Sequence, residues 1–107
     1  MTVISQVPVC SLDELPPGTA VRLELPGALA EPVAVFNVDG ALYAIDDTCT
    51  HQDASLADGW VEGCAVECPL HAACFDLRTG ATSGGPTSQG VRTHVVTVHE
   101  GTVYLAP

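Results

Sequence analysis

Two cysteines and two histidines stand in two short groups whose spacing could bind a metal. One residue separates Cys49 from His51, two residues separate Cys68 from His71, and 16 residues lie between the groups. Thiolates and imidazoles are the protein ligands of zinc and of some iron–sulfur clusters. A chain of this composition would match the four positions by chance about once in several thousand sequences. The sequence therefore predicts a metal site.

The division of the cysteines and histidines between the two groups favours an iron–sulfur cluster over a zinc site. A zinc finger usually has two cysteines at one end and two histidines at the other. Here each group supplies one of each. This division suits a two-iron cluster in which one iron takes both thiolates and the other both imidazoles, because each loop then reaches both irons. A zinc-binding interaction module remains the alternative, and it would be colourless where an iron–sulfur protein is red-brown.

The two groups resemble the C-x-H and C-x-x-H motifs of Rieske proteins. The rest of the chain is similar to the small Rieske-type ferredoxins of bacterial aromatic-ring dioxygenases. Supporting matches are Asp39-Gly40, Trp60, Phe75-Asp76, Arg78-Thr79-Gly80, Gly85-Pro86 and Arg92-Thr93. The resemblance implies one Rieske-type [2Fe–2S] cluster held by Cys49, His51, Cys68 and His71, and no catalytic residue.

The same resemblance implies a function in electron transport and aromatic hydrocarbon catabolism. The protein would be a one-electron carrier rather than an enzyme, passing electrons from a flavoprotein ferredoxin reductase to the terminal oxygenase. Both partners would dock through basic patches. We expect a cytoplasmic monomer. The alternative is a fixed small Rieske subunit of a larger oxidoreductase, such as a nitrite-reductase-like complex.

Four positions differ from the pattern of high-potential Rieske proteins. Asp53 and Leu70 stand where those relatives have two cysteines that form a disulfide. Ala73 and Phe75 stand where they have a serine and a tyrosine that donate hydrogen bonds to cluster sulfurs. Such hydrogen bonds favour the more negative reduced state, so their absence predicts a low reduction potential.

The charge of the chain limits its partners. Asp and Glu number 13 against 3 arginines and no lysine, a formal net charge of −10. This excess argues against binding nucleic acid or anionic membranes, which need cationic groups. Seven of the acidic residues lie within residues 46–76, together with all four predicted ligands. We interpret that segment as a docking surface for basic partners, and the alternative is that it is only a solvated face.

The other cysteines and the single tryptophan are given structural roles. Five cysteines, an odd number, and an N-terminus without basic residues argue against a secreted disulfide framework. We expect Cys10, Cys64 and Cys74 to be small packing residues. Trp60 is expected to pack in the core or under a loop, and the alternative is an anchor for a partner protein.

Short β-type segments separated by tight turns predict the fold. Asp39-Gly40 is a strong signal for a two-residue hairpin, and one helical turn is expected after Ser11. No sustained helical period is present. The chain is expected to be one all-β Rieske domain over residues 1–107, an antiparallel sandwich or partly open barrel. A cluster-binding subdomain of two loops, about residues 46–78, would be inserted in this β base. About eight strands are expected, at residues 2–9, 20–25, 33–38, 41–45, 61–68, 73–77, 93–99 and 102–105.

Overall fold

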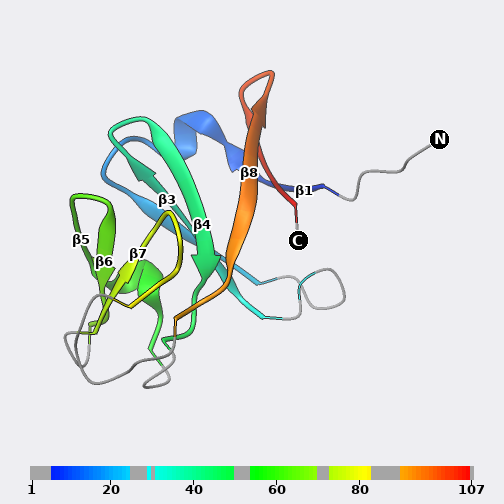
Figure 1. Cartoon of the computed structure of the whole chain (residues 1–107). Coiled ribbons are helices and arrows are strands. Elements are labelled where there is room, and N and C mark those ends of the chain that lie inside the picture. Colours follow the sequence, from blue (N-terminus) through cyan, green and yellow to red (C-terminus); the bar gives the residue numbers. More distant parts are fainter. Residues whose placement is uncertain are drawn as a thin grey trace.

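A computed structural model describes residues 6–24, 29, 31–49, 54–69, 73–82 and 90–106. Its main element is a six-stranded sheet in the order β1-β9-β8-β4-β3-β2, in which every neighbouring pair is antiparallel (Figure 1). The strands are β1 (Val7–Ser11), β2 (Ala20–Leu23), β3 (Val33–Val38), β4 (Ala41–Asp46), β8 (Thr93–His99) and β9 (Thr102–Ala106). The expected all-β antiparallel fold is confirmed.

The two halves of the sheet are joined through β8. Only Thr93 and His94, at the start of this strand, pair with β4, whereas residues 95–99 pair with β9. β8 therefore leaves one half of the sheet and continues in the other. This change of partner curls the sheet toward a barrel.

Two hairpins have turns of the same type, one of them at the predicted Asp39-Gly40. Asp39 and Gly40 have φ of 52° and 96°, and Glu100 and Gly101 have φ of 51° and 78°. Positive φ at both central residues defines the turn whose twist matches that of paired strands, and Asp-Gly is among its preferred sequences. These turns fix the register of β3 with β4 and of β8 with β9.

β3 and β4 form a wall between two hydrophobic cores. On β3, Val33 and Val35 pack with Val103 and Leu105 of β9 in one core. The alternate residues Ala34 and Phe36 face the other core. Because side chains alternate across a strand, a strand that is buried on both faces reads as a continuous apolar run, as residues 33–36 do.

The second core lies between this wall and a small sheet of three strands. These are β5 (Trp60–Glu62), β6 (Ala65–Glu67) and β7 (Cys74–Asp76), in the order β5-β6-β7. The expectation of one strand over residues 61–68 is wrong, because the chain reverses at Gly63, whose φ of 61° suits a turn. The small sheet falls between β4 and β8 in the chain, where the subdomain was expected.

Two short 3-10 helices complete the described structure. η1 (Leu12–Glu14) has a capping box: the Asp13 N–H donates to Ser11 Oγ, and the Ser11 N–H donates to a Glu14 carboxylate oxygen at 3.0 Å. The helical turn expected after Ser11 is confirmed. η2 (Leu56–Asp58) was not expected, and it packs against β2 and β3. In the part of the chain that is described, no helix is long and apolar enough to cross a membrane.

Candidate metal centre

Cys49 begins the first of two loops that carry the predicted ligands. It comes three residues after β4 and is 3% exposed. Its backbone N–H donates to the carbonyl oxygen of Ala54 at 3.0 Å, which closes a loop over residues 49–54, here called the first ligand loop. The thiol is thus held in the core at the start of a closed loop.

Cys68 begins the second ligand loop, residues 68–73, in the same way. It directly follows β6 and is fully buried. Its backbone N–H donates to the carbonyl oxygen of Ala73 at 2.7 Å, again five residues further on. Below this loop β6 and β7 pair through three successive residues of each strand. The second ligand loop is therefore the end of a β-hairpin.

The fold brings the two predicted cysteine ligands into one buried cluster. Cys49 and Cys68 share the second core with Leu56, Ala73 and Phe75, among others. Two buried thiols that begin similarly closed loops are a suitable donor set for an iron–sulfur cluster, since thiolates favour such centres. The residues present therefore fit the predicted group at the two positions that the structure describes.

The other two predicted ligands, His51 and His71, lie outside the described residues. Among the residues that are described, no three His, Cys, Asp or Glu side chains gather as a metal site. The four-residue ligand set thus stays a prediction. Of the remaining histidines, His94 lies with its Nε2 2.8 Å from Asp46 Oδ1, and His99 is exposed on β8.

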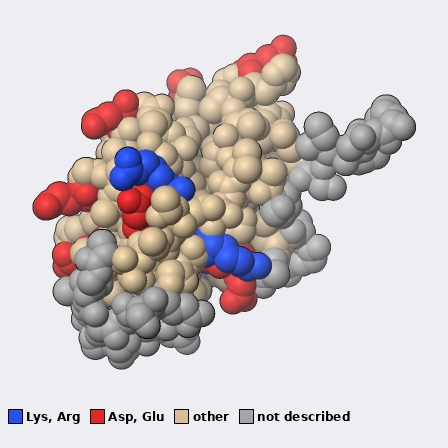
Figure 2. Space-filling view, in the orientation of Figure 1, with Lys and Arg blue, Asp and Glu red and all other residues tan. Residues whose placement is uncertain are grey.

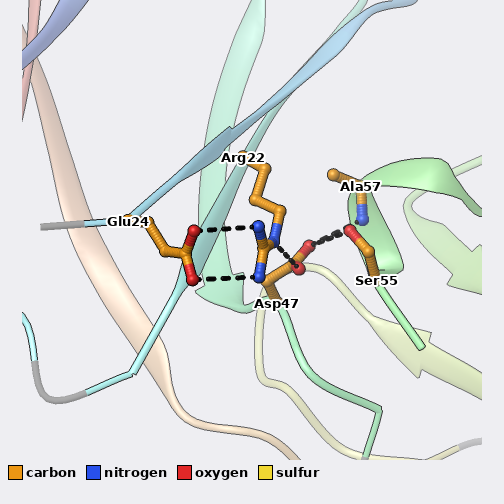
Figure 3. A network of polar contacts seen from close by, with 5 residues as sticks. All are labelled: Arg22, Glu24, Asp47, Ser55 and Ala57. Carbon is orange, nitrogen blue, oxygen red and sulfur yellow. Dashed lines mark hydrogen bonds and ion pairs between the residues drawn. The ribbon is translucent and has the colours of Figure 1, made fainter. Parts of the chain in front are cut away.

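A buried carboxylate supports the first ligand loop. Asp47 is 1% exposed, and its Oδ1 accepts hydrogen bonds from Ser55 Oγ at 2.8 Å and from the Ala57 N–H at 2.9 Å. Its Oδ2 accepts from Arg22 Nε at 2.8 Å, and the Arg22 guanidinium also contacts the Glu24 carboxylate (Figure 3). The hydrogen bond to Asp47 raises the pKa of Arg22 above its ordinary value. The sequence analysis missed this network. Asp47 is only two residues from Cys49, but no local signal in the sequence links it to Arg22 or Ser55.

A second carboxylate ties β4 to the segment that leads into β8. Asp46 Oδ2 accepts from Arg92 Nε at 3.0 Å, and the Asp46 N–H donates to the Arg92 carbonyl oxygen. A hollow beside Cys49 is lined by Asp46 and Arg92, together with Glu31, Thr48, Gly90 and Val91. The last residue of β4 and the residue after it therefore contact different parts of the chain. Asp46 contacts Arg92, just before β8, and Asp47 contacts Arg22 of β2.

All three arginines are engaged with carboxylates. Arg22 pairs with Asp47 and Glu24, Arg78 with Asp76, and Arg92 with Asp46. On the face drawn in Figure 2, the blue atoms accordingly lie beside red ones, while other acidic atoms stand apart from any blue. The arginines thus neutralise Asp46, Asp47 and Asp76. Within the predicted docking segment they leave Asp58, Glu62 and Glu67 as described acidic residues without an arginine.

Trp60 is exposed, contrary to its expected packing role. Its exposed fraction is 62%, and its neighbour Val61 is 43% exposed. It lies on β5, one of the two edge strands of the small sheet, directly opposite Glu67 of β6. Glu67 precedes the predicted ligand Cys68. The tryptophan therefore lies one strand away from the second ligand loop.

The remaining cysteines are only partly buried. Cys10, Cys64 and Cys74 all have intermediate exposure. A hydrogen bond with Cys64 raises the pKa of Tyr43 above its ordinary value. Burial, with a smaller contribution from Glu14, raises the pKa of Cys10.

Comparison with known proteins gives consistent matches over most of the chain. A family model described as the Rieske [2Fe-2S] domain matches residues 5–95. The 3-phenylpropionate/cinnamic acid dioxygenase ferredoxin subunit of Photorhabdus laumondii is 41% identical over 95% of this chain and 94% of its own. A chain in a complex of reduced oxygenase and oxidized ferredoxin in carbazole 1,9a-dioxygenase is 39% identical, with a TM-score of 0.88 over 94% of this chain and 92% of that one. A small subunit of a putative NADH-dependent nitrite reductase from Mycobacterium tuberculosis shares the fold, with a TM-score of 0.86 at 23% identity over 99% of this chain and 97% of that one.

Proposed function

The chain belongs to the Rieske [2Fe-2S] domain family and contains one Rieske-type [2Fe–2S] cluster, and from this premise we propose that it is the ferredoxin of an aromatic-ring dioxygenase system. It takes single electrons from a flavoprotein reductase and gives them to a terminal oxygenase. The observation that carries the proposal is the pair of buried cysteines, Cys49 and Cys68, each beginning a closed loop in one core. The similarity of this chain, over 95% of its length, to a dioxygenase ferredoxin subunit supports the same function.

In this proposal Cys49, His51, Cys68 and His71 hold the cluster. When bound, the cluster supplies one-electron oxidation and reduction. The chain itself supplies two thiolates in a water-poor core and two imidazoles from the same loops. Burial of Cys49 and Cys68 keeps solvent from the sulfur ligands. We place this ligand set in a subdomain of about residues 46–78 inserted in a single β domain.

The residues around the cysteines favour a low reduction potential. Ala73 and Phe75 are fully buried in the cluster of side chains that contains Cys49 and Cys68, and neither has a hydroxyl to donate. Hydrogen bonds to cluster sulfurs are one of the means by which a protein raises the potential. A core that lacks these two hydroxyls therefore suits a carrier that gives electrons away readily.

The charge around the second ligand loop favours basic partners. Asp58 is exposed beside the small sheet and Glu67 directly precedes Cys68, whereas Glu62 is exposed at the other end of the sheet, opposite Ala65. Every arginine is already paired. The unpaired carboxylates can therefore attract lysines and arginines on a reductase or an oxygenase, which raises the rate of encounter. We propose that the protein does this as a cytoplasmic monomer.

Reconstitution tests the proposal directly. The purified red-brown protein is added to an NADH-dependent ferredoxin reductase and the terminal oxygenase of carbazole 1,9a-dioxygenase, and hydroxylated product is measured. We expect product only when this protein is present, and little product with His51→Gln or His71→Gln. His99→Gln is the matched control, because His99 is exposed and far along β8. Isolation only as a tightly bound subunit of a larger oxidoreductase, or as a colourless zinc protein, would contradict the proposal.

A further inference from the structure

The two ligand loops are closed by the same bond but stand on different supports. In each loop the cysteine N–H donates to the carbonyl oxygen five residues further on. The second loop continues below that bond into the three paired residues of β6 and β7. Under the first loop the structure has one isolated bridge, between Thr48 and Ser55. The two arms of the first loop therefore need another means of being held together.

Asp47 supplies that means with its side chain. Its Oδ1 accepts from Ser55 Oγ and the Ala57 N–H, in addition to the backbone bond from the Leu56 N–H to the Asp47 carbonyl oxygen at 2.7 Å, which belongs to the bridge between Thr48 and Ser55. A single residue on the outgoing arm thus binds three successive residues on the returning arm. A β-hairpin would make these links through backbone pairs, whereas here a side chain makes two of them.

Asp47 also fixes the loop to the main sheet. Its N–H donates to the Pro32 carbonyl oxygen at 2.9 Å, and its Oδ2 accepts from Arg22 Nε of β2. The Arg22 guanidinium is held in turn by two contacts with Glu24, at 3.1 and 3.3 Å. Figure 3 shows the resulting line of contacts from Glu24 through Arg22 and Asp47 to Ser55. Because the carboxylate is buried and ionised groups are costly to bury without partners, this geometry is strongly specified.

We propose that Asp47 is a positioning residue: by joining the two arms of the first ligand loop to β2, it holds Cys49 at the distance from the second loop that the cluster requires. The inference rests on the proposed function, in which Cys49 is a ligand. Groups that orient metal ligands typically contribute about tenfold to a hundredfold to metal affinity or activity. Loosening the first loop should therefore loosen the cluster.

The test compares variants of the holo-protein by three measurements. These are the rate at which an iron chelator bleaches the cluster, the linewidths of the electron paramagnetic resonance (EPR) spectrum of the reduced protein, and hydrogen exchange of the Leu56 and Ala57 amides. Asp47→Ala removes the whole side-chain link. Ser55→Ala removes one hydrogen bond and serves if the first variant does not fold. Asp46→Asn is the control, since it removes the same charge one residue earlier and leaves the Asp47 contacts in place.

We expect Asp47→Ala to bleach about tenfold faster or more, with broader EPR lines and faster exchange of both amides. Ser55→Ala should change each measurement in the same direction by less, and Asp46→Asn should stay close to wild type. Equal changes in Asp46→Asn and Asp47→Ala would overturn the inference, because charge alone would then explain them. Unchanged amide exchange in Asp47→Ala would overturn it as well. A wild-type protein without a Rieske spectrum would refute the proposed function instead, and the exchange rates would still test the link between the loop arms.

Discussion

Replacing Gly59 by alanine tests how tightly the start of the small sheet is packed against the second ligand loop. Gly59 ends η2, and an added Cβ would collide with the backbone carbonyl oxygen of Glu67 and would lie 3.1 Å from Val66 Cγ2. The backbone of β6 would have to move, since a carbonyl oxygen cannot turn away as a flexible side chain can. Because Glu67 directly precedes Cys68, the displacement should reach the predicted ligand.

The expected loss of stability follows from two opposed contributions. Forcing one extra methyl group into a packed site costs about 1–3 kcal/mol. The φ of Gly59 is −80°, which alanine adopts freely, so the substitution returns about 0.4–1 kcal/mol by restricting the unfolded chain. From the midpoints of these two ranges the net destabilisation is about 1.3 kcal/mol, which corresponds to a fall in melting temperature of roughly 5–10 °C for a domain of this size. Thermal unfolding followed by far-ultraviolet circular dichroism measures it.

Gly63→Ala is the matched control. Gly63 lies at the turn between β5 and β6, where a Cβ would meet nothing within 4 Å, but its φ of 61° is unfavourable for alanine. This variant should also lose stability, by about 1–2 kcal/mol, while its visible and EPR spectra stay those of the wild type. Gly59→Ala should change both spectra. A Gly59→Ala protein with wild-type melting temperature and spectra would show that the contact with Glu67 is not tight, and it would refute the reasoning.

Three further predictions follow from charge and hydrogen bonding. Protein-film voltammetry should give a potential near the low end of the Rieske range, roughly −150 mV, and Ala73→Ser should raise it; a clearly positive wild-type value would contradict the role given to the missing hydroxyls. A hydrogen bond from Arg78 lowers the pKa of Asp76, so its stabilising contribution is complete above about pH 4 and is lost as the pH falls through the lower folded value. Asp76→Asn should therefore lose less stability than wild type in acid unfolding, and identical acid limbs would count against the ion pair. Electron transfer to a basic oxygenase should slow as ionic strength rises from about 0.01 to 0.1 M, where the screening length falls from about 30 to 10 Å, and stopped-flow rates independent of salt would exclude electrostatic steering.

The fold was predictable where local signals determine it. Asp39-Gly40 specifies its turn by conformation alone, and the strand expected over residues 33–38 is present with the same bounds. Gly63 was missed as a turn, because the flanking residues continue a β-type pattern and only the backbone conformation shows the reversal. Trp60 was misjudged because hydrophobicity favours burial, whereas its place on an edge strand of a three-stranded sheet leaves it exposed.

Local spacing in the sequence is enough to propose the ligands of the candidate site, but not to reveal what supports them. The spacing of Cys49 and Cys68 to their histidines is a local pattern that carries chemistry by itself. Asp47 depends on Arg22, which is 25 residues earlier in the chain, and on Ser55, eight residues later. The contacts of Asp47 with Arg22 and Ser55 become recognisable only in the structure, where β2 and η2 are packed together. The sequence predicted an acidic docking surface over residues 46–76. The structure reduces the number of carboxylates available to a partner, because it shows which of them the arginines neutralise.

The histidine ligands are the central claim, and pulsed EPR tests them most directly. The protein is labelled with ¹⁵N-histidine and reduced, and the nitrogen nuclei coupled to the cluster spin are counted. The proposed ligation by His51 and His71 predicts two strongly coupled histidine nitrogens, one from each ring, and one of them is lost in each single His→Gln variant. A spectrum without histidine nitrogen coupling, or one that both variants leave unchanged, would contradict it.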